Sequence, residues 1–244
     1  GSSLLRQSGA HSAIAMATAR RFAAEGWTLH LALRGPSRLQ ADRDDIAIRL
    51  GVEVTLHDYN ALDPDAIDEV MADLPALPDV VVCAVGLLGE QETAQRDADF
   101  ATLILRSNFE GPALHLERLA GRFEARGSGR IVGVTSVAGE RGRASNYVYG
   151  AAKSGFTAFL SGLRNRLHGT GVGVTTVLPG FVDTPMVAGR DLPPALTAQP
   201  EDVARAIFAA VEAERDVIYV KRRWRWMMAV VRALPEPVFK RTRF

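Results

Sequence analysis

Short apolar runs recur along the chain and are separated by stretches with helical periodicity. Six runs rich in Val, Leu and Ile predict strands at residues 29–33, 52–56, 80–85, 131–135, 172–178 and 217–220. A further strand is expected at residues 3–8, before a glycine-containing turn, although this segment is more polar than the others. Helical patterns lie between the strands, at residues 13–25, 64–73, 100–126, 151–167 and 200–213.

The order of these elements predicts the fold class. The strands lack polar alternation, as expected for a parallel sheet covered on both faces, and helices of crossover length connect them. We therefore expect an α/β protein with a doubly wound parallel sheet, a Rossmann fold, in a single domain at residues 1–220. Residues 221–244 are expected to form a basic amphipathic C-terminal extension.

Composition indicates the class of protein and the cellular compartment. The 244 residues are 47% hydrophobic and 23% charged, which is enough for one buried core. The single cysteine, Cys83, cannot form an internal disulfide, and we find no leader sequence and no apolar run of about 20 residues. These features predict a cytoplasmic protein. The body is acidic and carries no nucleic-acid recognition motif, so neither nucleic acid nor a metal is an expected partner.

The most specific chemical pattern is Tyr149-Gly150-Ala151-Ala152-Lys153, with Ser136 at the end of a predicted strand. The spacing places Tyr149 and Lys153 one helical turn apart. A phenol with an ordinary pKa of about 10 needs a nearby cation to exchange protons at neutral pH. Ser136 would hydrogen-bond the substrate oxygen and hold it near Tyr149. The alternative, a core tyrosine and a solvated lysine, is disfavoured because the chain prefers arginine to lysine by 26 to 3.

The turn after the first predicted strand is a weaker signal. In a doubly wound sheet this turn and the following helix N-terminus bind the pyrophosphate of a dinucleotide. Here it carries Gly9, His11, Ser12, Ala13 and Ile14, with one glycine where the usual fingerprint has three. An alanine-rich helix start capped by Ser12 is the alternative interpretation.

Arg34 follows the second predicted strand. An acidic residue at this place would bind the ribose of NAD, whereas an arginine can bind the 2′-phosphate of NADP. We therefore favour NADP(H), with Arg38 as a second candidate ligand, and keep NAD(H) as the alternative. A solvated arginine at a strand end is the competing interpretation of Arg34.

Together with Asn108-Phe109-Glu110-Gly111 and Pro179-Gly180, these motifs resemble the short-chain dehydrogenase/reductase family over residues 4–215. The resemblance implies that Asn108 is a fourth catalytic residue, which holds a water linking Lys153 to solvent. From the sequence alone, Asn108 would be interpreted as a kink inside a helix. The family also implies a homodimer or homotetramer, assembled through the helices at residues 100–126 and 151–167.

The resemblance also implies a path for the cofactor. Asp58 would contact the adenine, and the segment Cys83-Ala84-Val85-Gly86 would lie beside the ribose, although only Gly86 matches the family closely. The segment at residues 179–184 would touch the nicotinamide amide, with a substrate lid at residues 186–198; an ordinary strand-ending turn is the alternative. The expected cofactor-binding residues are Gly9, His11, Ser12, Ala13, Ile14, Arg34, Asp58, Ala84, Gly86, Tyr149, Lys153, Pro179, Gly180, Val182 and Thr184.

The C-terminal extension has a second amphipathic pattern. On a helix, Trp224, Met227, Met228, Val231 and Leu234 share a face, flanked by arginines. This face suits peripheral contact with an anionic membrane, or packing against the body or a second subunit. With this extension the chain is also similar to bacterial reductases of decaprenylphosphoryl 2-keto-pentoses, which implies a lipid-linked keto sugar as substrate.

The sequence thus predicts an NAD(P)(H)-dependent oxidoreductase that transfers a hydride between nicotinamide and a carbonyl or alcohol, with Tyr149 as general acid/base. The contrasting hypothesis is a catalytically weakened nucleotide-binding or membrane-peripheral protein on the same fold, suggested by the eroded glycine turn.

Overall fold

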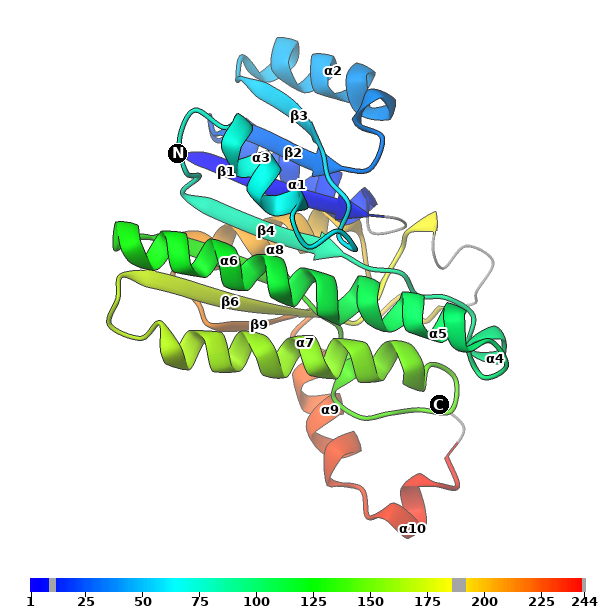
Figure 1. The fold of residues 1–244 in the computed structure, drawn as a ribbon. Coiled ribbons are helices and arrows are strands. Elements are labelled where there is room, and N and C mark those ends of the chain that lie inside the picture. The colour runs from blue at the N-terminus through cyan, green and yellow to red at the C-terminus, as the bar shows by residue number, and fades with distance from the viewer. Residues whose placement is uncertain (9–11, 186–191, 243–244) are drawn as a thin grey trace.

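A computed structural model describes residues 1–8, 12–185 and 192–242 (Figure 1). The described residues form a seven-stranded sheet in the order β3-β2-β1-β4-β5-β6-β9, with every pair parallel. The doubly wound α/β fold is therefore confirmed. The order reverses between β1 and β4, and ligands of such sheets bind at the carboxyl ends of the strands near this point. The strands are β1 Ser2–Ser8, β2 Thr28–Leu33, β3 Val54–Asp58, β4 Val80–Val85, β5 Gly129–Val134, β6 Val172–Pro179 and β9 Val217–Val220.

The polar first strand is present and lies at the centre of the sheet. β1 pairs with β2 on one side and with β4 on the other. Leu4 and Leu5 point to opposite faces and are fully buried, which anchors the strand in both halves of the core. The two buried leucines and the pairing on both sides hold β1 in the sheet, although its other five residues are polar.

Helices cover both faces of the sheet (Figure 1). On one face the Phe22 and Phe208 rings, from α1 and α8, meet edge to face at 5.0 Å between centroids. On the other face Phe123 and Phe156 are buried beside β5 and β6. The first group comprises α1 Ser12–Ala24, α2 Gln40–Leu50 and α8 Pro200–Glu212, and the second comprises α3 Ala66–Asp73, α6 Gly111–Arg126 and α7 Tyr147–Arg166.

The long helix expected at residues 100–126 is present, with a change of helix type inside it. A π-helical segment, η3 Arg106–Glu110, joins α5 Ala98–Leu105 to α6. Asn108 lies in this segment and donates from Nδ2 to the backbone oxygens of Ile104, at 2.8 Å, and Leu87, at 2.7 Å. Helix α2 was not predicted, because its sequence is polar and buries only Ile46.

Short elements complete the described chain. They are η2 Pro36–Leu39, α4 Gln91–Ala94, η4 Val137–Gly139, β7 Phe181–Val182, β8 Thr197–Ala198, α9 Arg223–Ala233 and α10 Glu236–Phe239. Helices α9 and α10 lie outside the layers, below α7 in the view of Figure 1. No helix within the described ranges is long and apolar enough to cross a bilayer.

Helix α9 packs against the body of the protein. Trp224 and Met228 are 3% and 2% exposed and lie against Val137 and Leu178, with Met227 and Val231 partly buried around them. The sequence left open whether this helix face contacts a membrane or packs against protein. Packing against the body of the chain accounts for the burial of Trp224 and Met228.

Candidate active site

Ser136, Tyr149 and Lys153 converge at the carboxyl ends of β4 and β5. Ser136 follows β5, and its Oγ accepts a hydrogen bond from the backbone N–H of Ala138 at 3.1 Å. Tyr149 and Lys153 come from the first two turns of α7, and their exposed fractions are 6% and 0%. The fold thus brings together three residues that the sequence singled out.

Two glycines allow η4 and α7 to approach closely enough for this arrangement. A Cβ atom added to Gly150 would lie 2.8 Å from the carbonyl oxygen of Ala138, and one added to Gly139 would lie 2.6 Å from the backbone nitrogen of Ser154. Both distances are shorter than van der Waals contact. The absence of side chains at these positions therefore sets the position of Ser136 relative to Tyr149.

The buried ammonium of Lys153 binds the ends of two strands. Its Nζ donates to the carbonyl oxygens of Val85 and Val134, each at 3.1 Å, and lies 5.8 Å from the centroid of the Tyr149 ring. Burial lowers the pKa of Lys153 to about 8, while the nearby Cys83 acts in the opposite direction. An ammonium has three donors, so one remains for a ligand.

Burial has the opposite effect on Tyr149. It raises the pKa of the Tyr149 hydroxyl to about 12, and a hydrogen bond with Ser136 opposes this rise. In the protein alone the hydroxyl is therefore protonated at neutral pH. A protonated phenol can donate to a developing alkoxide, as reduction of a carbonyl requires.

The Asn108 side chain links the segment after β4 to the helical segment η3 through hydrogen bonds. Its Oδ1 accepts from the backbone N–H of Leu87 at 3.2 Å, while its Nδ2 donates to the carbonyl oxygen of the same residue. The side chain is fully buried. Asn108 thereby fixes the course of the chain immediately beyond Gly86.

A cavity of about 100 Å³ opens beside Ser136 and Tyr149. A larger one of about 610 Å³ lies at the other edge of the sheet, around the amino ends of β5 and β6, away from these residues. We assign the chemistry to the smaller cavity because it contains the hydroxyls that can react. Its lining includes seven predicted residues, namely Ile14, Ser136, Tyr149, Pro179, Gly180, Val182 and Thr184.

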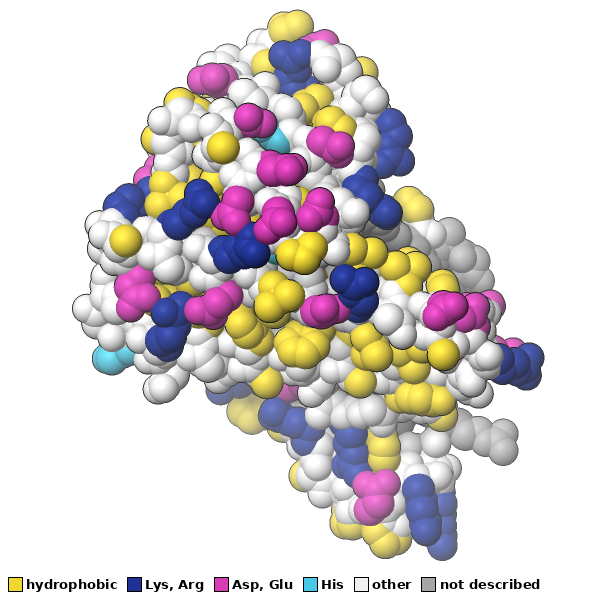
Figure 2. Space-filling model, viewed as in Figure 1, with side chains coloured by type: hydrophobic (Ala, Val, Ile, Leu, Met, Phe, Trp, Pro, Cys, Tyr) yellow, Lys and Arg dark blue, Asp and Glu magenta, His cyan; other side chains and the backbone are white. Residues whose placement is uncertain are grey.

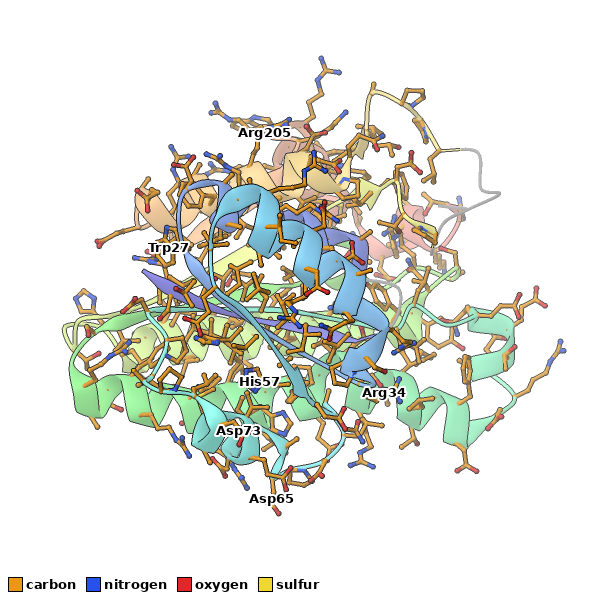
Figure 3. The ribbon with its side chains drawn as sticks, turned by 90° about the horizontal axis from the view of Figure 1, so that it is seen from above. Trp27, Arg34, His57, Asp65, Asp73 and Arg205 are labelled. Carbon is orange, nitrogen blue, oxygen red and sulfur yellow. The ribbon has the colours of Figure 1, made fainter. Side chains whose placement is uncertain are left out.

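The loop after β2 presents Arg34 to solvent (Figure 3). Asp58, at the end of β3, accepts from the backbone N–H of Gly35 at 3.2 Å and so closes this loop. The Arg38 guanidinium donates to the carbonyl oxygens of Arg34, at 2.6 Å, and Gly35, at 3.3 Å. Arg38 and Asp58 therefore shape the loop.

The remaining predicted cofactor residues lie along the same edge of the sheet. Ala84 belongs to β4 and Gly86 follows it, while Ser12 and Ala13 begin α1. The set fits a nicotinamide dinucleotide, with an exposed guanidinium for a phosphate, a helix N-terminus for the pyrophosphate and an apolar wall beside Tyr149. Gly9, His11 and residues 186–191 of the expected lid lie outside the described residues.

A sequence model described as "short chain dehydrogenase" matches residues 8–193, which include the predicted catalytic residues. The chain belongs to the short-chain dehydrogenase/reductase family. It is thus an NAD(P)-dependent oxidoreductase, as the sequence motifs predicted.

Other members of the family are similar over most of their length. An uncharacterised oxidoreductase of Mycobacterium tuberculosis is 36% identical, over 96% of this chain and 94% of its own. Sulfoacetaldehyde reductase 2 of Chromohalobacter salexigens is 32% identical, over 82% and 84%. A serine dehydrogenase in complex with NADP⁺ is 25% identical with a TM-score of 0.77, over 90% of this chain and 94% of that one. A short-chain dehydrogenase of Sphingobium yanoikuyae in complex with NADPH has the same fold, with a TM-score of 0.80 at 24% identity over 99% and 96%.

Two residues of this short-chain dehydrogenase/reductase were missed by the sequence prediction. Arg143 and Asn146 line the cavity together with Ser136 and Tyr149, as does Phe181 of the expected segment at residues 179–184. Arg143 and Asn146 lie in the loop between η4 and α7, where no motif marks them. Their position between two catalytic candidates was the signal that could have identified them.

Proposed function

We propose that this short-chain dehydrogenase/reductase is an NADPH-dependent carbonyl reductase in which Tyr149 is the general acid. The proposal is carried by one observation, the buried Tyr149 hydroxyl at a cavity that it shares with Ser136, one helical turn from the Lys153 ammonium. NADPH, when bound, supplies the hydride.

The side chains of the chain divide the remaining tasks. The O–H of Ser136 hydrogen-bonds Tyr149 in the protein alone, and on substrate binding it donates to the substrate carbonyl and orients it. Tyr149 gives its proton to the oxygen as negative charge develops there. Lys153 stabilises the phenolate that remains, since an ammonium near a phenolate lowers the phenol pKa. Asn108 is the fourth catalytic member and holds a water on the path by which the proton returns.

NADP(H) is the favoured cofactor, and NAD(H) is the alternative. The exposed guanidinium of Arg34 at the end of β2 can pair with a 2′-phosphate. The similar serine dehydrogenase was solved with NADP⁺, which supports the same choice here. The relative named sulfoacetaldehyde reductase supports a carbonyl as the reacting group.

A lipid-linked keto sugar is our more specific substrate candidate. Helix α9 packs beside the cavity through Trp224 but leaves Trp226 and Val230 74% and 64% exposed. Arginines at 222, 223 and 225 accompany them. An exposed tryptophan among cations suits peripheral contact with an anionic bilayer, which would bring the enzyme to such a substrate.

We further propose a cytoplasmic homodimer or homotetramer. Hydrophobic side chains gather over α5, α6 and α7 in Figure 2. Among them Leu105, Phe109 and Leu114 are 40%, 36% and 51% exposed. A contiguous apolar patch of this kind supports burial against a second subunit. The free buried thiol of Cys83 agrees with a reducing compartment.

Titration with NADPH and NADH, followed by energy transfer from tryptophan, tests the cofactor, and a screen of ketones and aldehydes tests turnover. We expect tighter binding of NADPH and its oxidation with at least one carbonyl. Preference for NADH would remove Arg34 as a phosphate ligand. Binding without any turnover would favour the contrasting hypothesis of a catalytically weakened nucleotide-binding protein.

A further inference from the structure

Arg143 is a cationic residue in the lining of the cavity beside Ser136 and Tyr149. Its side chain lines the cavity with Ser136 and Tyr149 and is half-buried. The buried Nε has no hydrogen-bond partner among the described residues. Within the described lining, Arg143 is the one formally charged side chain, and no carboxylate accompanies it.

The carboxylate at the start of the same loop pairs with other residues. Glu140 Oε1 accepts a hydrogen bond from the Tyr219 hydroxyl at 2.7 Å and pairs with Arg232 at 3.2 Å. Its Oε2 is buried without a hydrogen-bond partner among the described residues. No charged group contributes to the pKa of Arg143, so Glu140 does not supply its counter-charge.

An unpaired, partly desolvated cation is unfavourable in the protein alone. Burial lowers the pKa of the Arg143 guanidinium below its usual value, with no neighbouring charge contributing. A guanidinium nevertheless stays protonated at all accessible pH values, so the cost cannot be relieved by loss of a proton. An anion that enters the cavity and hydrogen-bonds the guanidinium would offset this cost.

The loop that carries Arg143 is held in place by the C-terminal extension. The Arg141 guanidinium donates to the carbonyl oxygens of Val231, at 2.6 Å, and Leu234, at 2.7 Å, and pairs with Glu236 at 3.0 Å. It also stacks on Phe239, with 3.7 Å between the guanidinium carbon and the ring centroid. Arg143 is thus presented from an anchored backbone, so little ordering is required when a ligand binds.

We propose that Arg143 binds an anionic group of the substrate, so that the enzyme reduces carbonyl compounds bearing a carboxylate, sulfonate or phosphate near the reacting carbon. This inference rests on the proposed carbonyl reduction and specifies its substrate class. Asn146 supports the same orientation, because its buried Oδ1 lacks a partner within the described ranges and lines the same cavity. In this proposal the Asn146 Oδ1 accepts a hydrogen bond from a substrate hydroxyl that lies beside the anionic group.

Matched pairs of ketones test the proposal. Levulinate is compared with its methyl ester, and dihydroxyacetone phosphate with dihydroxyacetone, by NADPH oxidation. We expect the wild-type enzyme to prefer the charged member of at least one pair, by about 10- to 100-fold in kcat/KM, as expected for a hydrogen bond to a charged group. The first pair reports carboxylate recognition and the second reports phosphate recognition.

The variant Arg143→Gln removes the charge, and Arg143→Lys retains it without the planar fork. We expect Arg143→Gln to abolish the charged-over-neutral preference and Arg143→Lys to restore part of it. Arg49→Gln is the matched control, because Arg49 is exposed on α2 and pairs with Asp45. NADPH titration verifies that each variant is folded. An unchanged preference in Arg143→Gln, or no preference in wild type, would overturn the inference.

Calorimetry separates this inference from the proposed function. The same compounds are titrated into NADP⁺-loaded protein, where binding is measured without turnover. If no carbonyl is reduced, carbonyl reduction fails as the function. The anion site is still supported if the charged compounds bind more tightly than the neutral ones and Arg143→Gln abolishes this difference. Equal binding of charged and neutral members rejects the anion site, whatever the turnover.

Discussion

The indole of Trp224 fills the space above Gly180 that a side chain would occupy. A Cβ atom added to Gly180 would lie 1.9 Å from Trp224 Nε1. The same Nε1 donates to the carbonyl oxygen of Leu196 at 3.0 Å, and the ring meets Phe181 edge to face at 5.2 Å between centroids. Because Gly180 and Phe181 line the cavity, the C-terminal extension supports the wall of the active site.

Gly180→Ala should therefore destabilise the protein. We expect the free energy of unfolding to fall by about 1–3 kcal/mol, because the indole must move to admit a methyl group. Urea denaturation of Gly180→Ala, Trp224→Leu and the double variant measures the coupling between the two positions. A Gly180→Ala penalty of equal size in both backgrounds would show that the contact with Trp224 is not its cause.

Gly162→Ala is the control for this substitution. Gly162 lies within α7, and a Cβ atom there would meet nothing within 4 Å. We expect the free energy of unfolding to rise by about 0.5–1 kcal/mol, because alanine favours a helix interior.

Tyr149→Phe should remove the proton donor while retaining the ring. We expect kcat for ketone reduction to fall about 100- to 10,000-fold, with NADPH affinity nearly unchanged. Tyr147→Phe is the matched control, since Tyr147 is 44% exposed and lies two residues earlier. Turnover is followed by NADPH absorbance and binding by fluorescence. Turnover of Tyr149→Phe at the wild-type rate would refute the acid role of Tyr149.

The buried ammonium predicts a pH-dependent stability. Lys153 has a pKa of about 8 in the folded protein, lowered from 10.5. Between these two values the unfolded chain binds more protons at this site than the folded protein, so stability rises with pH. Below pH 8 both states are protonated, and a burial penalty on the order of 3 kcal/mol is present in full.

Lys153→Met isolates this effect because methionine does not titrate. We expect the stability of the variant relative to wild type to be greatest near neutral pH and to decline by about pH 9.5, below the range where Tyr149 ionises. Urea denaturation of both proteins at several pH values measures the difference. A difference that is constant with pH would contradict the linkage.

Arg34→Gln should weaken discrimination between the two cofactors. Loss of a charge-assisted hydrogen bond to the 2′-phosphate should lower the ratio of kcat/KM for NADPH to that for NADH by about 10- to 100-fold. Figure 3 places Arg34 at the opposite end of β2 from Trp27, and Arg205 apart from both on α8. Arg205→Gln therefore serves as the control and should leave the ratio unaltered. A ratio in Arg34→Gln equal to that of the wild-type enzyme would exclude Arg34 as the phosphate ligand.

The sequence predicted the sheet and the grouping of Ser136, Tyr149 and Lys153 for the same reason. Apolar strand cores and the spacing of Tyr149 from Lys153 are local patterns, which the backbone geometry of strands and helices converts directly into position. The residues that were missed depend on distant contacts. Arg143 lines the cavity from a loop in which Arg141 binds carbonyl oxygens about ninety positions later in the chain, and no local pattern contains that information.

The π-helical segment illustrates the same limit on a smaller scale. The resemblance to the family marked Asn108, and the sequence alone suggested a kink, but neither predicted a change of helix type. The change accompanies the two hydrogen bonds between Asn108 and the backbone of Leu87, which lies in a different segment. Helix α2 escaped prediction because its single buried side chain, Ile46, gives no periodic signal.

The hydrogen bonds from Arg141 to the carbonyl oxygens at the end of α9 have a consequence for the transfer of this loop to other enzymes. The loop before α7 and the C-terminal extension form one structural unit, although they are separated in the gene. Grafting the loop alone into another short-chain dehydrogenase would leave Arg141 without its carbonyl acceptors. A chimera that keeps the backbone position of this loop must receive residues 221–244 together with residues 140–146.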